Sequence, residues 1–434
     1  MAVLSLLYLI LRKFSGFDEI DIKYILFSHK SKLSYIRNGV YFLNSFFDEN
    51  LLKEINEDFD KKYVPKKKYS LKYASVLSRI GENKRCQRVK DCSTYWEYGV
   101  YSDKSVKFHG ANFCKDVLCP VCAKRKSINL FKEVYSCINS LSTGQYAFLF
   151  ITLTVRDIYG EDLNKTCDLL RDSYNKLLDR KRLSFVKGSF RALEVTHDNE
   201  PFITRDMYFG NKKRHIKPRK KYYDKLGLTI GDPNPHFDMY HPHLHAIWIV
   251  DKNYFTSPDY LNQTELVSVW KDVLFVDYNP ICYIKRCVNK NKQDIDYLSE
   301  ANLASAVAEV AKYSVKGSDF LAGSDELNEK TVKCLLQCFK NRKMFVFTGL
   351  FRKLREQLLS GALVGIVLPV TSASSPDLVG KLIYSWCDSK SIYISSFHEV
   401  FNPKNIDKYN IVKVNLAEHF KNKISDVDLS DNIE

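Results

Sequence analysis

The chain has 434 residues, of which 45% are hydrophobic, enough for two or three domains with ordinary cores. Lys and Arg total 66 against 51 Asp and Glu, and the formal net charge of +15 favours a polyanionic partner, either nucleic acid or an acidic membrane surface. Because no stretch approaches the ~20 apolar residues that cross a bilayer, an integral membrane protein is excluded.

The first 85 residues are predicted to form a mostly helical region of unknown role. Residues 1–11 are apolar but lack a basic lead-in and a small-residue cleavage site, so we interpret them as a core helix rather than a signal peptide. A basic chain without a signal peptide is expected in the reducing cytoplasm. Clustered cysteines there bind metal more often than they form disulfides.

A Cys-rich block follows. Four of its cysteines are candidate ligands of a structural zinc ion: Cys92, Cys114, Cys119 and Cys122. The last two have the spacing of a zinc knuckle, and Cys86 competes with Cys92 for the fourth position. A redox-active pair is the alternative, but no thioredoxin-like βαβ pattern surrounds the block. Structural zinc is favoured over free cysteines.

Strand and helix signals alternate after this block. Residues 147–155 and 190–196 are predicted strands because they are rich in β-branched and aromatic residues, and 163–178 shows helical spacing. Glu194 is an acid in an otherwise apolar strand, on the face opposite its two neighbours. A carboxylate there can complete a metal site with histidines on a neighbouring strand. The alternative is an exposed residue of an edge strand.

A long basic excursion separates this strand from the next. Residues 212–221 contain seven cations and no acid. The cations are Lys212, Lys213, Arg214, Lys217, Arg219, Lys220 and Lys221. Such a run is more often a solvated face than a binding site. Tyr222 and Tyr223 lie beside it, as Tyr69 and Tyr73 lie beside another basic stretch, and their rings favour nucleic acid by offering stacking surfaces. A long insertion is usually a functional loop or hairpin, or disordered.

Three alternating histidines lead into a predicted core strand that ends at Val250. Side chains on a strand alternate between faces, so His241, His243 and His245 project from one side while Leu244 faces the core. Imidazoles held side by side suit a divalent metal ion. A structural zinc site, or an ordinary set of strand histidines, is the alternative.

Two helices are predicted next, at 261–274 and 302–316. In the second helix, Glu309, Tyr313 and Lys316 would share one face, where they could act as base, nucleophile and phosphate clamp. A solvated polar face is the alternative. An amphipathic helix at 351–359, a boundary at 361–375 and a short tail domain complete the chain.

Four motifs, in this order, resemble the plasmid rolling-circle replication initiators of the HUH endonuclease superfamily: Phe148–Thr154, Arg191–Glu194, Tyr240–His245 and Glu309–Lys316. The cysteine block and Gly349–Lys353 also resemble the subgroup typified by small plasmids of Gram-positive bacteria. The resemblance covers roughly residues 86 to 355. The long basic excursion departs from the family pattern.

The resemblance implies an α+β fold with a central antiparallel sheet flanked by helices, joined here by a Cys-rich zinc-binding element and helical flanking regions. We therefore expect four parts in chain order: an N-terminal region at 1–85, the Cys-rich element at 86–130, the HUH endonuclease domain at 131–345 and a C-terminal region at 346–434.

The resemblance also implies residue roles. His243 and His245 would bind Mg or Mn, with Glu194 as a third ligand and His241 assisting. Tyr313 would attack the origin phosphodiester, which links it to the 5′ end and frees a 3′-OH primer.

Glu309 would activate water at termination, and Lys316 would steady the scissile phosphate. The partner would be origin DNA, single-stranded or extruded at the nick, with a host helicase and polymerase as further candidates. A relaxase or transposase of the same chemistry, or a non-catalytic zinc-dependent DNA-binding regulator, are the alternatives.

Overall fold

The central element of the fold is a six-stranded sheet in the order β10-β6-β7-β5-β8-β9. The computed structural model describes residues 36–37, 40–41, 49–101, 105–141, 144–211, 216–290, 296, 300–312, 314–360 and 377–399. The strands are β5 (Tyr146–Thr154), β6 (Gly188–His197), β7 (Tyr240–Asp251), β8 (Cys282–Val288), β9 (Glu300–Asn302) and β10 (Phe345–Thr348). Neighbours are antiparallel except β8 and β9. The predicted α+β class with a central antiparallel sheet is confirmed.

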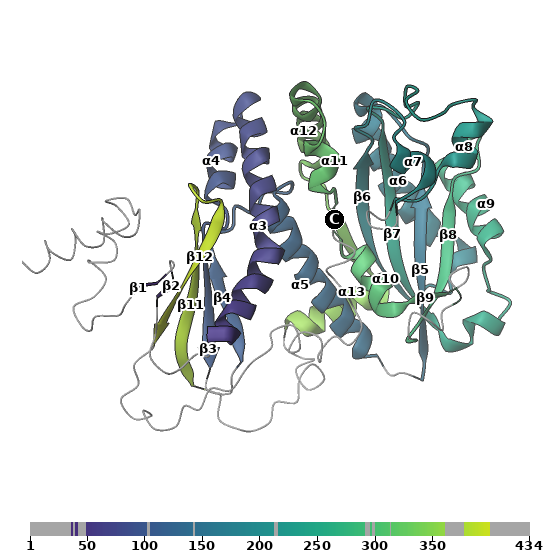
Figure 1. Cartoon of the computed structure of the whole chain (residues 1–434). Coiled ribbons are helices and arrows are strands. Elements are labelled where there is room, and N and C mark those ends of the chain that lie inside the picture. The colour runs from purple at the N-terminus through teal and green to yellow at the C-terminus, as the bar shows by residue number, and fades with distance from the viewer. Residues whose placement is uncertain are drawn as a thin grey trace, which may run out of the picture.

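Helices cover both faces of this sheet (Figure 1). On one face, here the α6 face, pack α6 (Gly160–Leu178), α9 (Gln263–Leu274) and α12 (Asp325–Phe339). On the other, the α10 face, pack α5 (Pro120–Asn139), α10 (Leu303–Val310) and α13 (Gly349–Leu359). Strand β7 divides its side chains accordingly: Leu244 and Trp248 enter the α6 face, and Ile247 enters the α10 face. Burial on both faces explains the nearly continuous apolar run of this strand.

A second sheet joins parts of the chain that are far apart in sequence. Its order is β12-β11-β3-β4, with β3 (Tyr95–Tyr101), β4 (Val106–Ala111), β11 (Leu378–Cys387) and β12 (Ile392–Glu399). Phe59 stacks on Tyr384 at 3.7 Å between ring centroids, and Trp96 packs edge-on against Phe59. The predicted Cys-rich element and the predicted C-terminal region each contribute two strands to this one sheet. The hairpins β3–β4 and β11–β12 would each be marginally stable alone. Pairing of β3 with β11 joins them, and the two hairpins share one aromatic core.

The N-terminal region contributes the helix that stands between the two sheets (Figure 1). Helix α3 (Glu49–Arg79) contacts α5, α11, α12 and β12, and α4 (Asn83–Asp91) packs beside it. The short strands β1 (Ile36–Arg37) and β2 (Val40–Tyr41) pair with each other. The predicted core helix at 1–11 and the boundary at 361–375 lie outside the described residues.

Smaller elements complete the described chain. They are α7 (Arg205–Phe209), α8 (Lys220–Lys225), α11 (Gly317–Leu321) and the 3-10 helices η1 (Lys181–Leu183) and η2 (Lys252–Thr256). None of the helices in the described ranges is long and apolar enough to cross a membrane.

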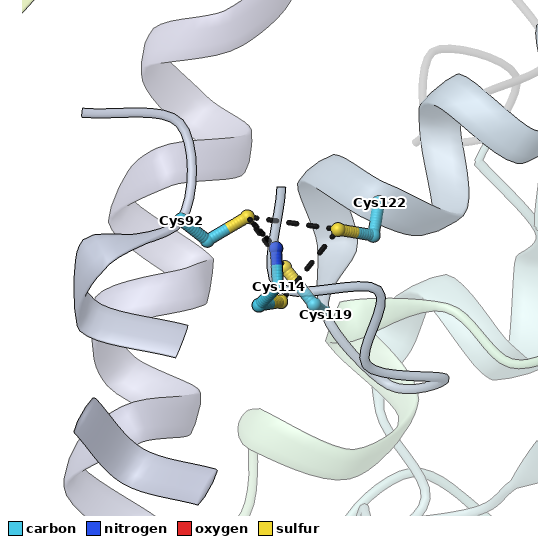
Figure 2. Close-up of side chains that lie close together, drawn as sticks. All are labelled: Cys92, Cys114, Cys119 and Cys122. Atoms are coloured by element: carbon cyan, nitrogen blue, oxygen red, sulfur yellow. Dashed lines mark hydrogen bonds between the residues drawn. The ribbon is translucent and has the colours of Figure 1, made fainter. Parts of the chain in front are cut away.

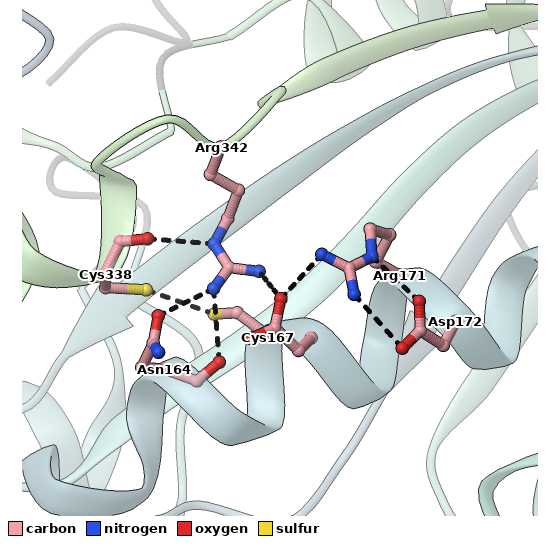
Figure 3. A network of polar contacts seen from close by, with 7 residues as sticks. Asn164, Cys167, Arg171, Asp172, Cys338 and Arg342 are labelled. Carbon is pink, nitrogen blue, oxygen red and sulfur yellow. Dashed lines mark hydrogen bonds and ion pairs between the residues drawn. The ribbon is translucent and has the colours of Figure 1, made fainter.

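Arg342 fixes the end of α12 against α6 (Figure 3). Its guanidinium donates to the carbonyl of Cys338 at 2.9 Å, to the side chain of Asn164 at 2.8 Å and to Asp168 at 2.9 Å. One of the unsatisfied carbonyls at the end of α12 thereby gains a charged donor. The contact sets the direction in which the chain enters β10, and β10 pairs with β6.

Candidate functional site

The register of β6 and β7 brings an acid and two histidines together on the α10 face. Glu194 lies directly opposite His243, and directly opposite residues of an antiparallel pair point to the same side. The Glu194 Oε2 atom is 3.4 Å from Nε2 of His243 and 3.4 Å from Nε2 of His245. All three side chains are buried. The three donors, called the Glu-His-His group below, can hold a metal ion.

Both imidazoles of the group are held by their other nitrogen. Nδ1 of His243 donates to the carbonyl of His241 at 3.1 Å, and Nδ1 of His245 is 3.0 Å from the Thr152 hydroxyl. In the neutral imidazole this bond leaves a lone pair on Nε2 of His243 for a metal ion, whereas a protonated ring donates from Nε2 to Glu194. Phe150 stacks against the His245 ring. These contacts fix the rings in the orientation a metal ligand needs.

Glu194 is kept ionised by its neighbours. Burial by itself would raise the pKa of this carboxyl, but hydrogen bonds and charge interactions with His243 and His245 overcome burial and hold the pKa well below its usual value. Ligand atoms about 2.1 Å from one divalent ion lie roughly 3.0–3.4 Å apart. The observed spacing of 3.4 Å therefore fits a cation between these donors.

A carboxylate from α10 reaches the same place. Glu309 Oε1 lies 3.9 Å from Nε2 of His245, although the two residues are far apart in sequence. The Lys312 ammonium contacts the other carboxylate oxygen of Glu309. The structure thus joins two motifs that the sequence predicts separately.

The predicted helix at 302–316 ends early. Helix α10 stops at Val310, and Lys316 is the N-cap of α11, so Glu309 and Lys316 do not share a helical face. The cause lies at β6, which loses its partner β10 after Ala192. The N–H of Val195 instead donates to the carbonyl of Ser314 at 2.7 Å, and a buried N–H requires such a partner. Tyr313 lies outside the described residues.

His241 belongs to a neighbouring network. Its Nδ1 is 2.7 Å from Asp157 Oδ1, and the second oxygen of Asp157 is 2.6 Å from Nδ1 of His236. These contacts hold the pKa of Asp157 well below its usual value, against the raising effect of burial. The His241 ring lies 5.1 Å from the ring of His243, but its nitrogens are not in the Glu-His-His group.

The four predicted cysteines form a second cluster, called the four-cysteine group below, beside α3 (Figure 2). Sγ of Cys122 lies 3.6 Å from those of Cys92 and Cys114, and Sγ of Cys119 lies 3.6 Å from that of Cys92. Sulfurs around a tetrahedral zinc ion with bonds of about 2.3 Å are about 3.8 Å apart, so the cluster fits this ion. Cys86, the competing candidate, is buried in the core of the α6 face instead.

A buried ammonium lies next to the four-cysteine group. Lys67 is 0% exposed, and its Nζ donates to the carbonyls of Lys90 and Cys92 at 2.6 Å each. Buried cations need an anionic counterpart or strong acceptors. Four thiolates on one zinc ion carry a net negative charge, which a lysine in this position offsets.

The basic excursion is a small folded unit in its described parts. Its core is made of four side chains: Ile203, Met207, Tyr208 and Tyr223. Of the predicted cations, Lys212, Lys213 and Arg214 lie outside the described residues, while Lys217, Arg219, Lys220 and Lys221 are exposed. Arg219 pairs with Asp198 and Lys220 with Asp224. This insertion connects β6 to β7 at the end that carries the Glu-His-His group.

Two of the four predicted stacking tyrosines are buried. Tyr73 donates to Asp116 from the core of the α6 face, and Tyr223 lies in the core of the insertion. Their rings are therefore not available to a ligand. Tyr222 and Tyr69 are exposed, and the Tyr222 hydroxyl is 2.8 Å from Nε2 of His236.

A family model described as replication protein matches residues 105–394 of the chain. The chain belongs to this replication-protein family. A "Protein rep" from Bacillus sp is 29% identical over 303 residues, which cover 67% of this chain and 86% of the relative. Another "Protein rep", from Streptococcus pneumoniae serotype 2, is 25% identical over 354 residues, or 80% of this chain and 95% of the relative. No solved structure matches the chain.

Membership confirms the resemblance to plasmid rolling-circle replication initiators that the motifs predict. The family match reaches residue 394, beyond the predicted limit near 355, and so includes β11 and part of β12. These strands carry no motif residues. Their place in the sheet with β3 explains why they belong to the family unit.

Sequence reasoning missed several residues of this region. Thr152 orients His245, Asp157 holds His241, and Lys312 contacts Glu309. The threonine left a signal, because Thr152 and Thr154 interrupt one face of an apolar strand at the same parity. The other two contacts depend on tertiary packing between elements, which local pattern does not specify.

Proposed function

We propose that this protein nicks one strand of DNA at a plasmid double-strand origin by metal-dependent transesterification and rejoins the strand at termination. One observation carries the proposal: the Glu309 carboxylate and the backbone of Ser314 both reach the Glu-His-His group and its strand. The residue between Lys312 and Ser314 in sequence is the proposed nucleophile, Tyr313.

In the nicking step, the Tyr313 oxygen bonds to phosphorus while the bond to the 3′ oxygen breaks. The phenol proton is transferred in net terms to the departing oxygen, which gives a 5′-phosphotyrosine and a 3′-OH primer. His243, His245 and Glu194 would hold Mg or Mn, with His241 assisting, and the bound ion would stabilise charge on the non-bridging oxygens. One phosphodiester replaces another, so rejoining needs no nucleotide cofactor.

At termination, the same site would carry out a second reaction, the hydrolysis of a phosphodiester. Glu309 would take a proton from a water whose oxygen bonds to phosphorus while the bond to the 3′ oxygen breaks and that oxygen takes up a proton. Lys312 holds the Glu309 carboxylate near His245. Lys316 would steady the scissile phosphate from the start of α11. A phosphate bound here would lie among a metal ion and two ammonium groups, an arrangement suited to displacement at phosphorus.

The remaining features would bind DNA and stabilise the fold. The insertion presents Lys217 and Lys221 at the surface, and we assign it, together with Lys212, Lys213 and Arg214, to the phosphates of origin DNA. The four-cysteine group would hold a structural zinc ion. A host helicase would unwind the nicked duplex, and a host polymerase would extend the 3′-OH.

The test is nicking of supercoiled DNA that carries the protein's own replicon, in the presence of Mn. We expect an open circle and a covalent protein–5′-DNA adduct, both absent in Tyr313→Phe and in excess chelator. Glu309→Gln is expected to retain the adduct but fail to release the strand by hydrolysis. Specific binding without nicking would instead favour a non-catalytic zinc-dependent regulator. Strand transfer into unrelated DNA would favour a relaxase or transposase.

A further inference from the structure

A run of exposed apolar side chains follows α9 and ends on β8, at the end of the sheet where the Glu-His-His group lies. We call Phe275–Tyr283 the rim segment. Phe275 is 96% exposed, Ile281 60% and Tyr283 44%. The neighbouring Val276 and Cys282 pack into or against the core of the α6 face. The segment is therefore anchored, and its larger side chains face outward.

Sheet register places the β8 end of the rim segment, at Tyr283, on the same face of the sheet as the Glu-His-His group. Tyr283 lies directly opposite Thr152, and Thr152 lies directly opposite His245, so the three point to the α10 face. Two strand spacings separate Tyr283 from His245, roughly 10 Å. The hydroxyl of Thr154, which lies opposite His243, donates to the carbonyl of Ile281 at 2.8 Å.

Phe275 has a backbone conformation that a phenylalanine rarely adopts. Its φ is 57° and its ψ 51°, in the left-handed region at the end of α9, where glycine or asparagine is usual. The side chain gains almost no burial in return. A strained position occupied by an exposed aromatic ring points to a ligand that covers the ring.

A cation and an aromatic ring are already stacked in the same segment. The Arg156 guanidinium lies 3.9 Å from the Tyr278 ring centroid, and the backbone N–H of Arg156 donates to the Tyr278 hydroxyl at 3.1 Å. The guanidinium also pairs with Asp277 of the same segment at 3.1 Å, so it offers a nucleobase a planar face to stack on rather than an unpaired charge.

Given these observations, we propose that the rim segment, with Arg156, is a stacking surface for unpaired DNA bases that flank the phosphate at the Glu-His-His group. The inference rests on the proposed function, which supplies the single-stranded ligand. The net charge of +15 favours a nucleic acid over an apolar protein partner at this surface. Stacking is tolerant of sequence, so origin choice would come from other contacts.

The test measures equilibrium binding of the full-length protein in chelator, where no strand is cut. The probes are a labelled twenty-nucleotide thymidine oligonucleotide and an abasic oligonucleotide of the same length and charge. Tyr283→Ala and Phe275→Ala are each expected to weaken binding of the first probe about 5- to 150-fold. Binding of the abasic probe, which has phosphates but no bases, should be unchanged. Tyr283→Phe should restore binding of the thymidine probe.

Phe275→Gly separates a ligand-binding role from a structural one. Glycine relieves the left-handed conformation, so this variant is expected to melt at a higher temperature while it binds the thymidine probe as weakly as Phe275→Ala. Tyr260→Ala, an exposed tyrosine just before the other end of α9, is the matched control and should bind normally.

Each outcome bears on a separate claim. Equal loss of both probes, or normal binding by Tyr283→Ala and Phe275→Ala, overturns the stacking surface. Base-dependent loss in a protein that never nicks its own replicon supports the surface but contradicts the proposed function. Weaker binding of an apolar peptide library, with unchanged DNA binding, would assign the segment to a protein partner and also overturn the inference.

Discussion

The donors of the Glu-His-His group stand on two neighbouring strands, whereas the four-cysteine group draws on a helix end, a loop and the start of another helix. Strand register and second contacts such as Thr152 hold the first group in place without an ion. The cysteines come from Cys92 after α4, Cys114 in a loop, and Cys119 with Cys122 at the start of α5. The sheet holds the first site in place, whereas a bound zinc ion would hold together the separate elements of the second.

The two groups also differ in what they leave open. Three donors around one ion leave coordination positions for a substrate oxygen, while four thiolates close the sphere. The comparison therefore separates a site suited to chemistry from a site suited to stability. Four substitutions test this distinction.

Removal of one thiolate should unfold the region around the four-cysteine group. For Cys119→Ser we expect loss of zinc and a large fall in the free energy of unfolding, since zinc binding contributes on the order of 10 kcal/mol to such sites. Metal analysis and urea denaturation measure both. Cys86→Ala, a buried cysteine outside the group, should keep its zinc. Full zinc content in Cys119→Ser would contradict the assignment.

Removal of one histidine should abolish nicking with little effect on the fold. His243→Ala loses a ligand, and we expect metal affinity to fall by at least about 100-fold. Manganese titration and the nicking assay report the change, while the melting temperature should stay close to that of the parent. His109→Ala, on β4 of the other sheet, serves as the control. A collapse of the fold in His243→Ala would erase the distinction between the groups.

Lys67→Met should destabilise the protein by about 2–3 kcal/mol, because two buried carbonyls lose a charged donor. The negative charge of the four-cysteine group would also lose its nearby ammonium, so zinc should dissociate faster to a competing chelator. Lys68→Met, one residue along α3 and exposed, is the control. Equal zinc release rates in both variants would show that Lys67 acts on packing alone.

Thr152→Val preserves shape and removes only the contact to His245. We expect manganese affinity to weaken about 10- to 100-fold, as for other residues that orient a metal ligand. Excess manganese should restore nicking, which distinguishes poor metal binding from a damaged active site. Unchanged affinity would mean that the strands alone orient the imidazole.

Much of the Glu-His-His group follows from local pattern. Alternation on β7 separates His243 and His245 from Leu244, and parity on β6 puts Glu194 on the matching face. The limit of α10 was not predictable, because it depends on a distant strand whose Val195 N–H takes the Ser314 carbonyl. Burial of Lys67 was not predictable for the same reason, because a lysine in a basic run gives no local sign that distant carbonyls will accept its hydrogen bonds.

Pairing of β3 with β11 has a consequence for how the protein is made. The first strand of the second sheet leaves the ribosome about 280 residues before its partner, since Tyr95–Tyr101 must wait for Leu378–Cys387. Until β11 is made, one edge of β3 stays unpaired, and long-range pairing of this kind is slow and prone to aggregation. A chain that stopped before β11 would therefore leave β3 and β4 as a two-stranded hairpin, a unit that is marginally stable by itself.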